Sequence, residues 1–266
     1  MDILEILGYF GALLIGVVLG LIGGGGSILT VPVLVYLLAI NPVTATAYSL
    51  FVVGTSALVG ALRNIPKKLI DFRTAFVFAI PAFIAVYLTR KFLVPAIPED
   101  IFSLGGFTLT RDIGIMVFFA VIMIIASISM IQEKDNGRNL KEIKVSYNYP
   151  LIIIEGIVVG LLTGIVGAGG GFLIIPALVL LAKLPMKKAV ATSLLIIAIK
   201  SLIGFIGDVE NMKIDWIFLF IFTGLSIGGI WLGVYLNNIV NGKKLKKAFG
   251  WFVLLMGIYI IWSEIY

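Results

Sequence analysis

The sequence predicts an all-α, polytopic membrane protein made of two inverted repeats, in which glycines break the helices and short helices re-enter the membrane. Of its 266 residues, 61% are hydrophobic and 13% are charged, against roughly 45–50% and 25% in soluble domains. Several apolar stretches reach the ~20 residues that a helix needs to cross a bilayer. Two glycine tracts, Gly23–Gly26 and Gly167–Gly171, stand at matching places in the two halves.

The apolar stretches define the expected helices. They cover residues 6–22, 27–40, 43–62, 72–94, 113–131, 150–167, 171–183, 187–206, 216–236 and 248–263. The longest polar break, 132–149, is expected to be a cytoplasmic linker between a first membrane repeat, 1–131, and a second, 150–266. Asp71 and Asp215 open apolar helices and are expected to cap their N-termini.

The two halves align without a gap when the chain is shifted by 144 residues. In this register, 18 of the 56 pairs that start with Gly16 and Gly160 are identical. Shared hydrophobicity could match leucines by chance, but it would not match the glycines, Pro32 with Pro176 or Asp71 with Asp215. We interpret the chain as an internal duplication.

The placement of basic residues predicts how the repeats enter the membrane, because cytoplasmic loops are enriched in lysine and arginine. Loop 63–73 is strongly basic, whereas its repeat counterpart, 207–217, holds one lysine and three acidic residues. In the second half the basic cluster falls in loop 237–247 instead. With 63–73, 132–149 and 237–247 all cytoplasmic, the repeats are inverted and both termini lie outside.

Each glycine tract is expected to end a helix, since glycine costs roughly 1 kcal/mol per residue in a helix interior. The apolar run that follows has only about 13 residues, too few to span the membrane. We expect it to dip into the membrane and return with the following helix. Non-helical backbone at membrane depth is buried in protein or lines a wet cavity, so the glycines should lie at the centre of the protein.

The two tracts also predict an anion site. New helices are expected to begin at Ser27 and Gly171, and a helix start presents unpaired N–H groups and about half a positive charge. Two converging starts would bind an anion without a charged side chain. The candidate residues are Gly24, Gly25, Gly26, Ser27, Gly169, Gly170 and Gly171. The alternative is that the glycines only allow close helix packing.

A polar stripe on the helix after each tract extends this candidate site. Ser49 and Ser56 share one helical face, and their counterparts are Ser193 and Lys200, with Thr192 beside them. A mid-helix lysine costs about 2.5–3.5 kcal/mol on insertion scales and should face the protein interior. Lys200 could attract the anion or carry a proton; alternatively it snorkels to the membrane interface.

The sequence lacks the residues that redox, metal-dependent, ATP-hydrolysing or other enzymatic chemistry would need. The chain has no cysteine and no histidine, which excludes disulfides, haem or zinc sites on those ligands and imidazole relays. It has no G-x-x-x-x-G-K-[ST] motif for ATP and no acid–base or metal-ligand set typical of an enzyme. We therefore expect no catalytic residues, no metal and no cofactor. The net charge of +6 sits in loops and reflects membrane orientation rather than nucleic-acid binding.

The duplicated motifs resemble one known family. A Gly-x-Gly-Gly tract, a short apolar helix with a proline and then Ala-x-x-Ser-Leu occur twice, as residues 23–32 with 47–50 and 167–176 with 191–194. This pattern resembles the TauE/SafE sulfite-exporter family over essentially the whole chain. The resemblance implies a bacterial or archaeal plasma-membrane permease for sulfur-containing anions such as sulfite, sulfonates or sulfoacetate. Tyr48 departs from the threonine usual in the family's motif.

The leading hypothesis is a secondary transporter for a small oxyanion, with a proton or a sodium ion as the coupling ion. An anion channel with the same selectivity site is the first alternative. A non-transporting membrane assembly factor, in which the glycines only pack helices, is the second. The expected partners are a small anionic substrate and the lipid bilayer, and the sequence leaves the oligomeric state open.

Overall fold

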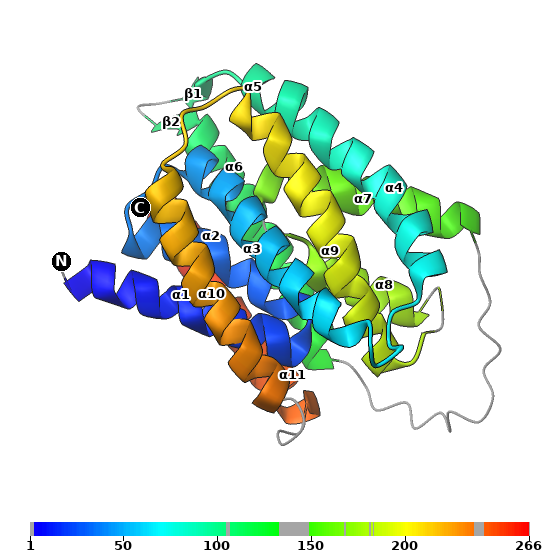
Figure 1. The fold of residues 1–266 in the computed structure, drawn as a ribbon. Coiled ribbons are helices and arrows are strands. Elements are labelled where there is room, and N and C mark those ends of the chain that lie inside the picture. The colour runs from blue at the N-terminus through cyan, green and yellow to red at the C-terminus, as the bar shows by residue number, and fades with distance from the viewer. Residues whose placement is uncertain are drawn as a thin grey trace.

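The computed structural model describes residues 3–104, 107–132, 149–167, 169–180, 182, 184–236 and 242–265. It is a bundle of long helices that cross one another at the centre (Figure 1). In chain order the elements are α1 (Ile3–Ile22), the 3-10 turn η1 (Gly24–Leu29), α2 (Thr30–Pro32), the π turn η2 (Val33–Leu37), α3 (Pro42–Asn64), α4 (Phe72–Leu88), the π turn η3 (Thr89–Leu93), α5 (Val94–Ala96), β1 (Asp100–Leu104), β2 (Phe107–Thr110), α6 (Arg111–Gln132), α7 (Tyr149–Val166), α8 (Gly171–Leu180), α9 (Met186–Val209), α10 (Trp216–Leu236) and α11 (Gly242–Ile265).

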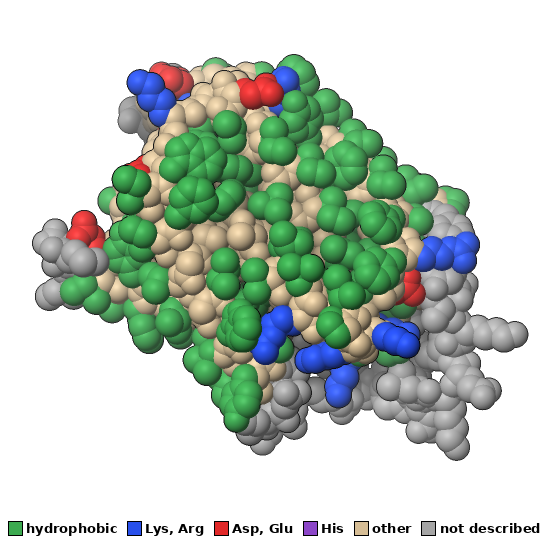
Figure 2. Space-filling model, in the orientation of Figure 1, with side chains coloured by type: hydrophobic (Ala, Val, Ile, Leu, Met, Phe, Trp, Pro, Cys, Tyr) green, Lys and Arg blue, Asp and Glu red, His purple; other side chains and the backbone are tan. Residues whose placement is uncertain are grey.

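The expected all-α membrane class is confirmed. Within the described residues, six helices are long and apolar enough to cross a membrane, and three shorter apolar helices accompany them. Hydrophobic side chains cover the middle of the face shown in Figure 2, and charged side chains gather towards its edges. A wide exposed apolar surface of this kind is what a lipid environment requires.

The first glycine tract turns the chain back on itself. Gly23 has φ +83, in the left-handed region that glycine adopts without strain. After it, η1, α2 and η2 form one short helical arm that runs antiparallel to α1, with Gly26 against Ile15 and Gly11 against Val33. The arm packs mainly on the preceding helix, because the glycine faces of α1 let it approach closely. Its expected return through the membrane with the following helix stays a prediction.

The packing between the halves follows the 144-residue register. Helices α3 and α9, which are repeat counterparts, lie against each other and run antiparallel: Gly60 contacts Leu194, and Gly204 contacts Leu50. The two contacts are equivalent, because Gly60 is the counterpart of Gly204 and Leu194 is the counterpart of Leu50 in this register. The contacts therefore fit a two-fold relation between the repeats, while the side of the membrane that each end faces stays a prediction.

The outer helices repeat the same exchange. Helix α1 packs on α10, and its counterpart α7 packs on α4. At these crossings Gly16 lies against the backbone of Ser226, and Gly160 lies against the backbone of Ala82. Small residues allow membrane helices to approach this closely, so these two glycines, which lie outside the glycine tracts, serve helix packing.

Hydrogen bonds also connect the halves in pairs. Asp71 Oδ1 accepts from Thr74 N at 2.9 Å, and Asp215 Oδ1 accepts from Phe218 N at 3.1 Å, so both predicted N-caps are confirmed. The backbone N–H of Asp71 donates to Thr192 Oγ1 at 3.0 Å, and that of Asp215 donates to Tyr48 Oη at 2.7 Å. Each cap is thus bonded to the opposite repeat at matching positions, since Tyr48 and Thr192 are counterparts in the 144-residue register.

Two parts of the expected organisation differ or fall outside the described residues. The stretch 95–112, which no expected helix covers, contains an antiparallel hairpin in which Ser103 pairs with Thr108. Its strands have only five and four residues, and only the second, Phe107–Thr110, alternates apolar and polar residues, so the pattern is too short to predict a hairpin from the sequence. The linker 132–149 lies almost wholly outside the described residues, as does the start of the basic loop 237–247.

Candidate functional site

The two glycine tracts meet inside the bundle, as their matching positions suggested. Gly24 lies directly against Gly171, and a Cβ on Gly169 would come within 3.2 Å of Ser27 Cβ. Gly24, Gly171 and Gly169 are all buried. The backbones of the two tracts therefore touch, and no side chain separates them.

The first tract is engaged mainly in packing. Its helical turn η1 begins at Gly24 rather than at Ser27, with Gly25 inside the turn, and Ser27 Oγ donates to Gly24 O at 2.7 Å. A Cβ on Gly26 would collide with the backbone of α1. A six-residue 3-10 turn has little dipole of its own, so the first tract contributes less positive field than a regular helix start would.

The second tract opens a regular helix beside a charged side chain. Gly169 and Gly170 have φ +63 and +64, and Gly170 O accepts hydrogen bonds from the first turn of α8, which starts at Gly171. A Cβ on Gly170 would lie 2.9 Å from Lys200 Nζ. The positive N-terminal end of α8 and the ammonium group of Lys200 therefore lie next to each other.

Lys200 is completely buried, in contrast to a lysine that snorkels to the interface. Its Nζ donates to Thr163 Oγ1 at 2.7 Å. No carboxylate within the described residues forms an ion pair with it. A buried cation beside a positive helix end is unfavourable unless an anion offsets it or the amine is neutral. This position is the centre of the candidate site.

The rest of the predicted stripe is only partly free. Ser56 donates to Ser226 at 2.9 Å, Ser193 donates to Val190 O at 2.8 Å, and Thr192 accepts from the Asp71 backbone. Ser49 Oγ is buried without a partner among the described residues. Of the stripe, Lys200 and Ser49 therefore keep the most capacity for a ligand.

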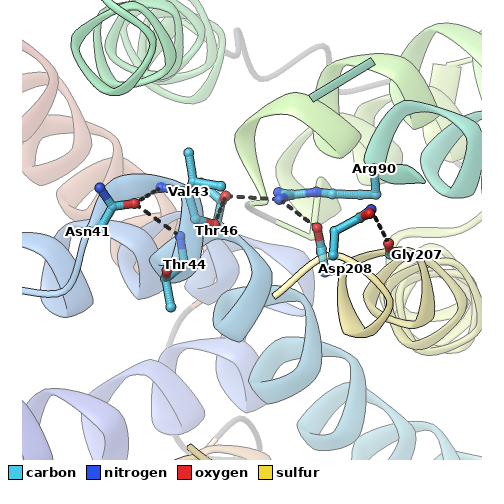
Figure 3. A network of polar contacts seen from close by, with 8 residues as sticks. Asn41, Val43, Thr44, Thr46, Arg90, Gly207 and Asp208 are labelled. Atoms are coloured by element: carbon cyan, nitrogen blue, oxygen red, sulfur yellow. Dashed lines mark hydrogen bonds and ion pairs between the residues drawn. The ribbon is translucent and has the colours of Figure 1, made fainter. Parts of the chain in front are cut away.

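A second charged cluster was missed by the sequence reasoning. Arg90, in η3, is completely buried; its Nη1 donates to Thr46 Oγ1 at 3.0 Å and lies 3.4 Å from Asp208 Oδ1 (Figure 3). Its place in the apolar stretch 72–94 was a usable signal, because an ionisable residue inside a membrane helix marks a functional site by default. The π turn that carries Arg90 is a second such signal in structure.

The Arg90 cluster adjoins the second glycine tract. The backbone and Cβ of Thr46 lie against Gly167, where the tract begins, and the side chain of Thr89 lies against Gly164, in the last turn of α7. Nearby, a cavity of about 290 Å³ is lined by Glu5, Tyr9, Leu38, Ile40, Thr44, Tyr48, Asp215 and Phe218. Arg90, the tract and Lys200 thus follow one another inward from this end of the bundle.

Both cations belong to the second tract alone. In the 144-residue register Lys200 corresponds to Ser56, Arg90 to Val234 and Asp208 to Asn64. The fold is nearly symmetric, but its charge is not. Among the described residues, the buried charged side chains beside the two touching tracts therefore lie on the side of Gly167–Gly171.

The fold and site define a polytopic helical membrane protein with a cationic interior. The chain belongs to the sulfite exporter TauE/SafE family, whose model matches residues 9–260. It is accordingly a membrane transporter, and a multi-pass protein of the prokaryotic plasma membrane.

Relatives span nearly its whole length. A probable membrane transporter protein of Xylella fastidiosa (strain 9a5c) is 28% identical over 257 residues, which is 94% of this chain and 92% of the relative. YunE of Bacillus subtilis, also a probable membrane transporter protein, is 28% identical with the same coverage. MJ0441 of Methanocaldococcus jannaschii is 34% identical over 43% of this chain and 45% of its own length. No solved structure matches the chain.

Proposed function

We propose that this protein is a secondary transporter, a permease that moves a small sulfur-containing anion such as sulfite or an organosulfonate across the membrane. One observation is the main support for an anionic substrate: Lys200 is fully buried beside the start of α8 and has no carboxylate partner among the described residues. A cation and a helix N-terminus that share one position repel each other, and an anion bound between them would relieve this repulsion.

The expected interaction is strong because the site is buried. Two unit charges 4 Å apart interact by about 4 kcal/mol at an effective dielectric constant of 20, against about 1 kcal/mol in water. Thr163 holds the ammonium in place, and Gly170 leaves the backbone open to close approach.

The sulfur chemistry of the anion is supported by the family and by the duplicated Gly-x-Gly-Gly motifs, which resemble those of sulfite exporters. The same proposal includes energy coupling to a proton or a sodium ion. An anion channel, the alternative, would show neither saturation nor accumulation and would use the same binding site.

Flux into proteoliposomes tests the proposal. The purified protein is reconstituted and offered sulfite, sulfate, thiosulfate and short organosulfonates, with and without proton and sodium gradients. We expect saturable uptake of at least one sulfur-containing anion and accumulation against its gradient when the coupling ion is supplied. Unsaturable flux that only dissipates gradients would identify a channel. Absence of flux for every anion would indicate a non-transporting membrane protein.

A further inference from the structure

The guanidinium of Arg90 has unused hydrogen-bonding capacity. Within the described residues, its Nε and Nη2 have no hydrogen-bond partner although the side chain is completely buried. These two nitrogens form the side-on edge that binds two oxygens of a carboxylate, phosphate or sulfonate at once. The edge best suited to an oxyanion is therefore the one that the protein leaves unoccupied.

The ion pair with Asp208 is weak in geometry. A single contact of 3.4 Å joins Nη1 to Oδ1, whereas a paired arginine and carboxylate commonly form two short parallel bonds. Oδ2 of Asp208 and Oγ1 of Thr89 are also buried without partners in the described part of the chain. A buried ion pair with several unsatisfied polar atoms contributes little to stability, because its attraction and hydrogen bonds do not offset the cost of desolvating both charges.

The position of the Arg90 cluster suggests a function for its unsatisfied polar atoms. Asp208 lies eight residues after Lys200 on α9, a rise of about 12 Å along the helix. Between the two levels lies the second glycine tract, which Thr46 contacts at Gly167 and Lys200 contacts at Gly170. An anion that enters from the end of the bundle near Thr44 and Tyr48 would meet Arg90 before it reaches Lys200.

We propose that Arg90 is a second anion-binding residue of the transport pathway, and that the carboxylate of Asp208 holds its guanidinium while no anion is bound there. The inference rests on the proposed function. The substrate oxyanion replaces Asp208 at the guanidinium and uses the free Nε and Nη2 edge, with the hydroxyl of Thr89 as a further donor. The pair therefore acts as an internal gate: the carboxylate of Asp208 occupies the guanidinium of Arg90 until the substrate anion replaces it.

Three variants test this assignment, with sulfite and methanesulfonate as probes of binding to the purified protein. Asp208→Asn removes the competing charge and keeps the shape, so the dissociation constant should fall about tenfold or more. Arg90→Met should abolish binding at this level but leaves a buried carboxylate unpaired. The double variant Arg90→Met with Asp208→Asn removes both charges, so it should fold, and its dissociation constant should rise at least tenfold above that of the wild type.

The neighbouring ion pair supplies the matched control. Lys91 Nζ and Glu210 Oε2 lie 2.7 Å apart and are partly exposed, so Lys91→Met with Glu210→Gln should bind both probes like the wild type. A purely structural Arg90–Asp208 pair predicts that Asp208→Asn does not strengthen binding and that the double variant binds and transports normally; that result overturns the inference and leaves the transporter intact. A wild-type protein that neither binds nor carries any sulfur-containing anion overturns the proposed function, and the gate with it.

Discussion

The residue that most clearly separates the two repeats is Lys200. Its counterpart Ser56 bonds to another serine, whereas Lys200 bonds to Thr163, whose own counterpart is Leu19. A lysine in the core of a membrane helix costs several kcal/mol to insert. It is buried beside a helix start without a compensating carboxylate in the described residues, and the proposed anion would supply the missing charge.

Replacing Lys200 should therefore weaken anion binding without weakening the fold. Lys200→Met keeps the side-chain length and removes both the charge and its desolvation cost, so thermal stability should be unchanged or higher. The dissociation constant for the transported anion should rise tenfold or more, on the order of 1.4 kcal/mol. Lys91→Met, which removes the same charge at a partly exposed place, is the control. Normal affinity in Lys200→Met would remove this lysine from the site.

Sequence reasoning located Lys200 and overlooked Arg90 for a physical reason. Nine apolar or small neighbours in the run 194–203 make Lys200 conspicuous in the sequence, without knowledge of its hydrogen-bond partner. Arg90 stands near the end of an apolar stretch, where a basic residue usually marks the membrane interface. Its burial depends on Asp208, 118 residues away in the chain, and on the approach of Gly207, which only the fold brings together.

At the scale of elements, glycines on one helix have opposite surroundings. On α10, a Cβ at Gly229 would collide with the backbone of α1 at Leu13, whereas a Cβ at the adjacent Gly228 would meet nothing within 4 Å. The first glycine permits the crossing of α1 and α10, and the second faces outward. Substitutions at these two glycines therefore measure two different effects on one helix: helix packing at Gly229 and helix propensity at Gly228.

Substituting these two glycines gives a direct test of that difference. Gly229→Ala should lower the free energy of unfolding by about 1–3 kcal/mol, since it overpacks a backbone contact. Gly228→Ala should leave it unchanged or raise it by up to about 1 kcal/mol, because alanine favours the helix. Thermal denaturation of both purified variants measures the effect. Equal stabilities would mean that the crossing of α1 and α10 adjusts without cost.

The elements themselves follow closely from hydropathy and glycine. Every expected apolar stretch corresponds to a helical segment with similar bounds, because membrane helices need long apolar runs and glycine ends them. The packing of the arm after Gly23 on α1 did not follow, since an apolar run of about 13 residues can pack on either neighbour. Nor did the starting point of its first turn, which tightens into a 3-10 helix at Gly24 to pack against the opposite tract.

For the whole molecule, the antiparallel contact of α3 and α9 bears on the orientation in the membrane. Counterpart helices that cross the bilayer in opposite directions place the ends of the two repeats on opposite sides. The exposed turn after α3 contains Lys67, and the exposed segment after α9 contains Lys213. With the basic turn in the cytoplasm, as the excess of positive charge there predicts, the second segment faces outward.

Single cysteines can verify this orientation because the native chain contains none. In intact cells, a membrane-impermeant thiol reagent should label Lys213→Cys and should label Lys67→Cys only after permeabilisation. Labelling of both positions from outside would show that the repeats enter in the same sense. Labelling of Lys67→Cys alone would reverse the orientation and keep the inversion.

The crossing of α1 with α10 has a consequence for how the chain is made. Helix α1 opens the chain and α10 lies far along it, yet the atoms nearest to a Cβ on Gly16 or Gly20 belong to the backbone of α10. At a synthesis rate of 5–20 residues per second, the roughly 200 residues between them take about 10–40 s to emerge from the ribosome. Throughout this interval the first helix stays in the lipid with its glycine face unpaired, and the insertion machinery or the lipids must occupy that face until the last part of the protein arrives.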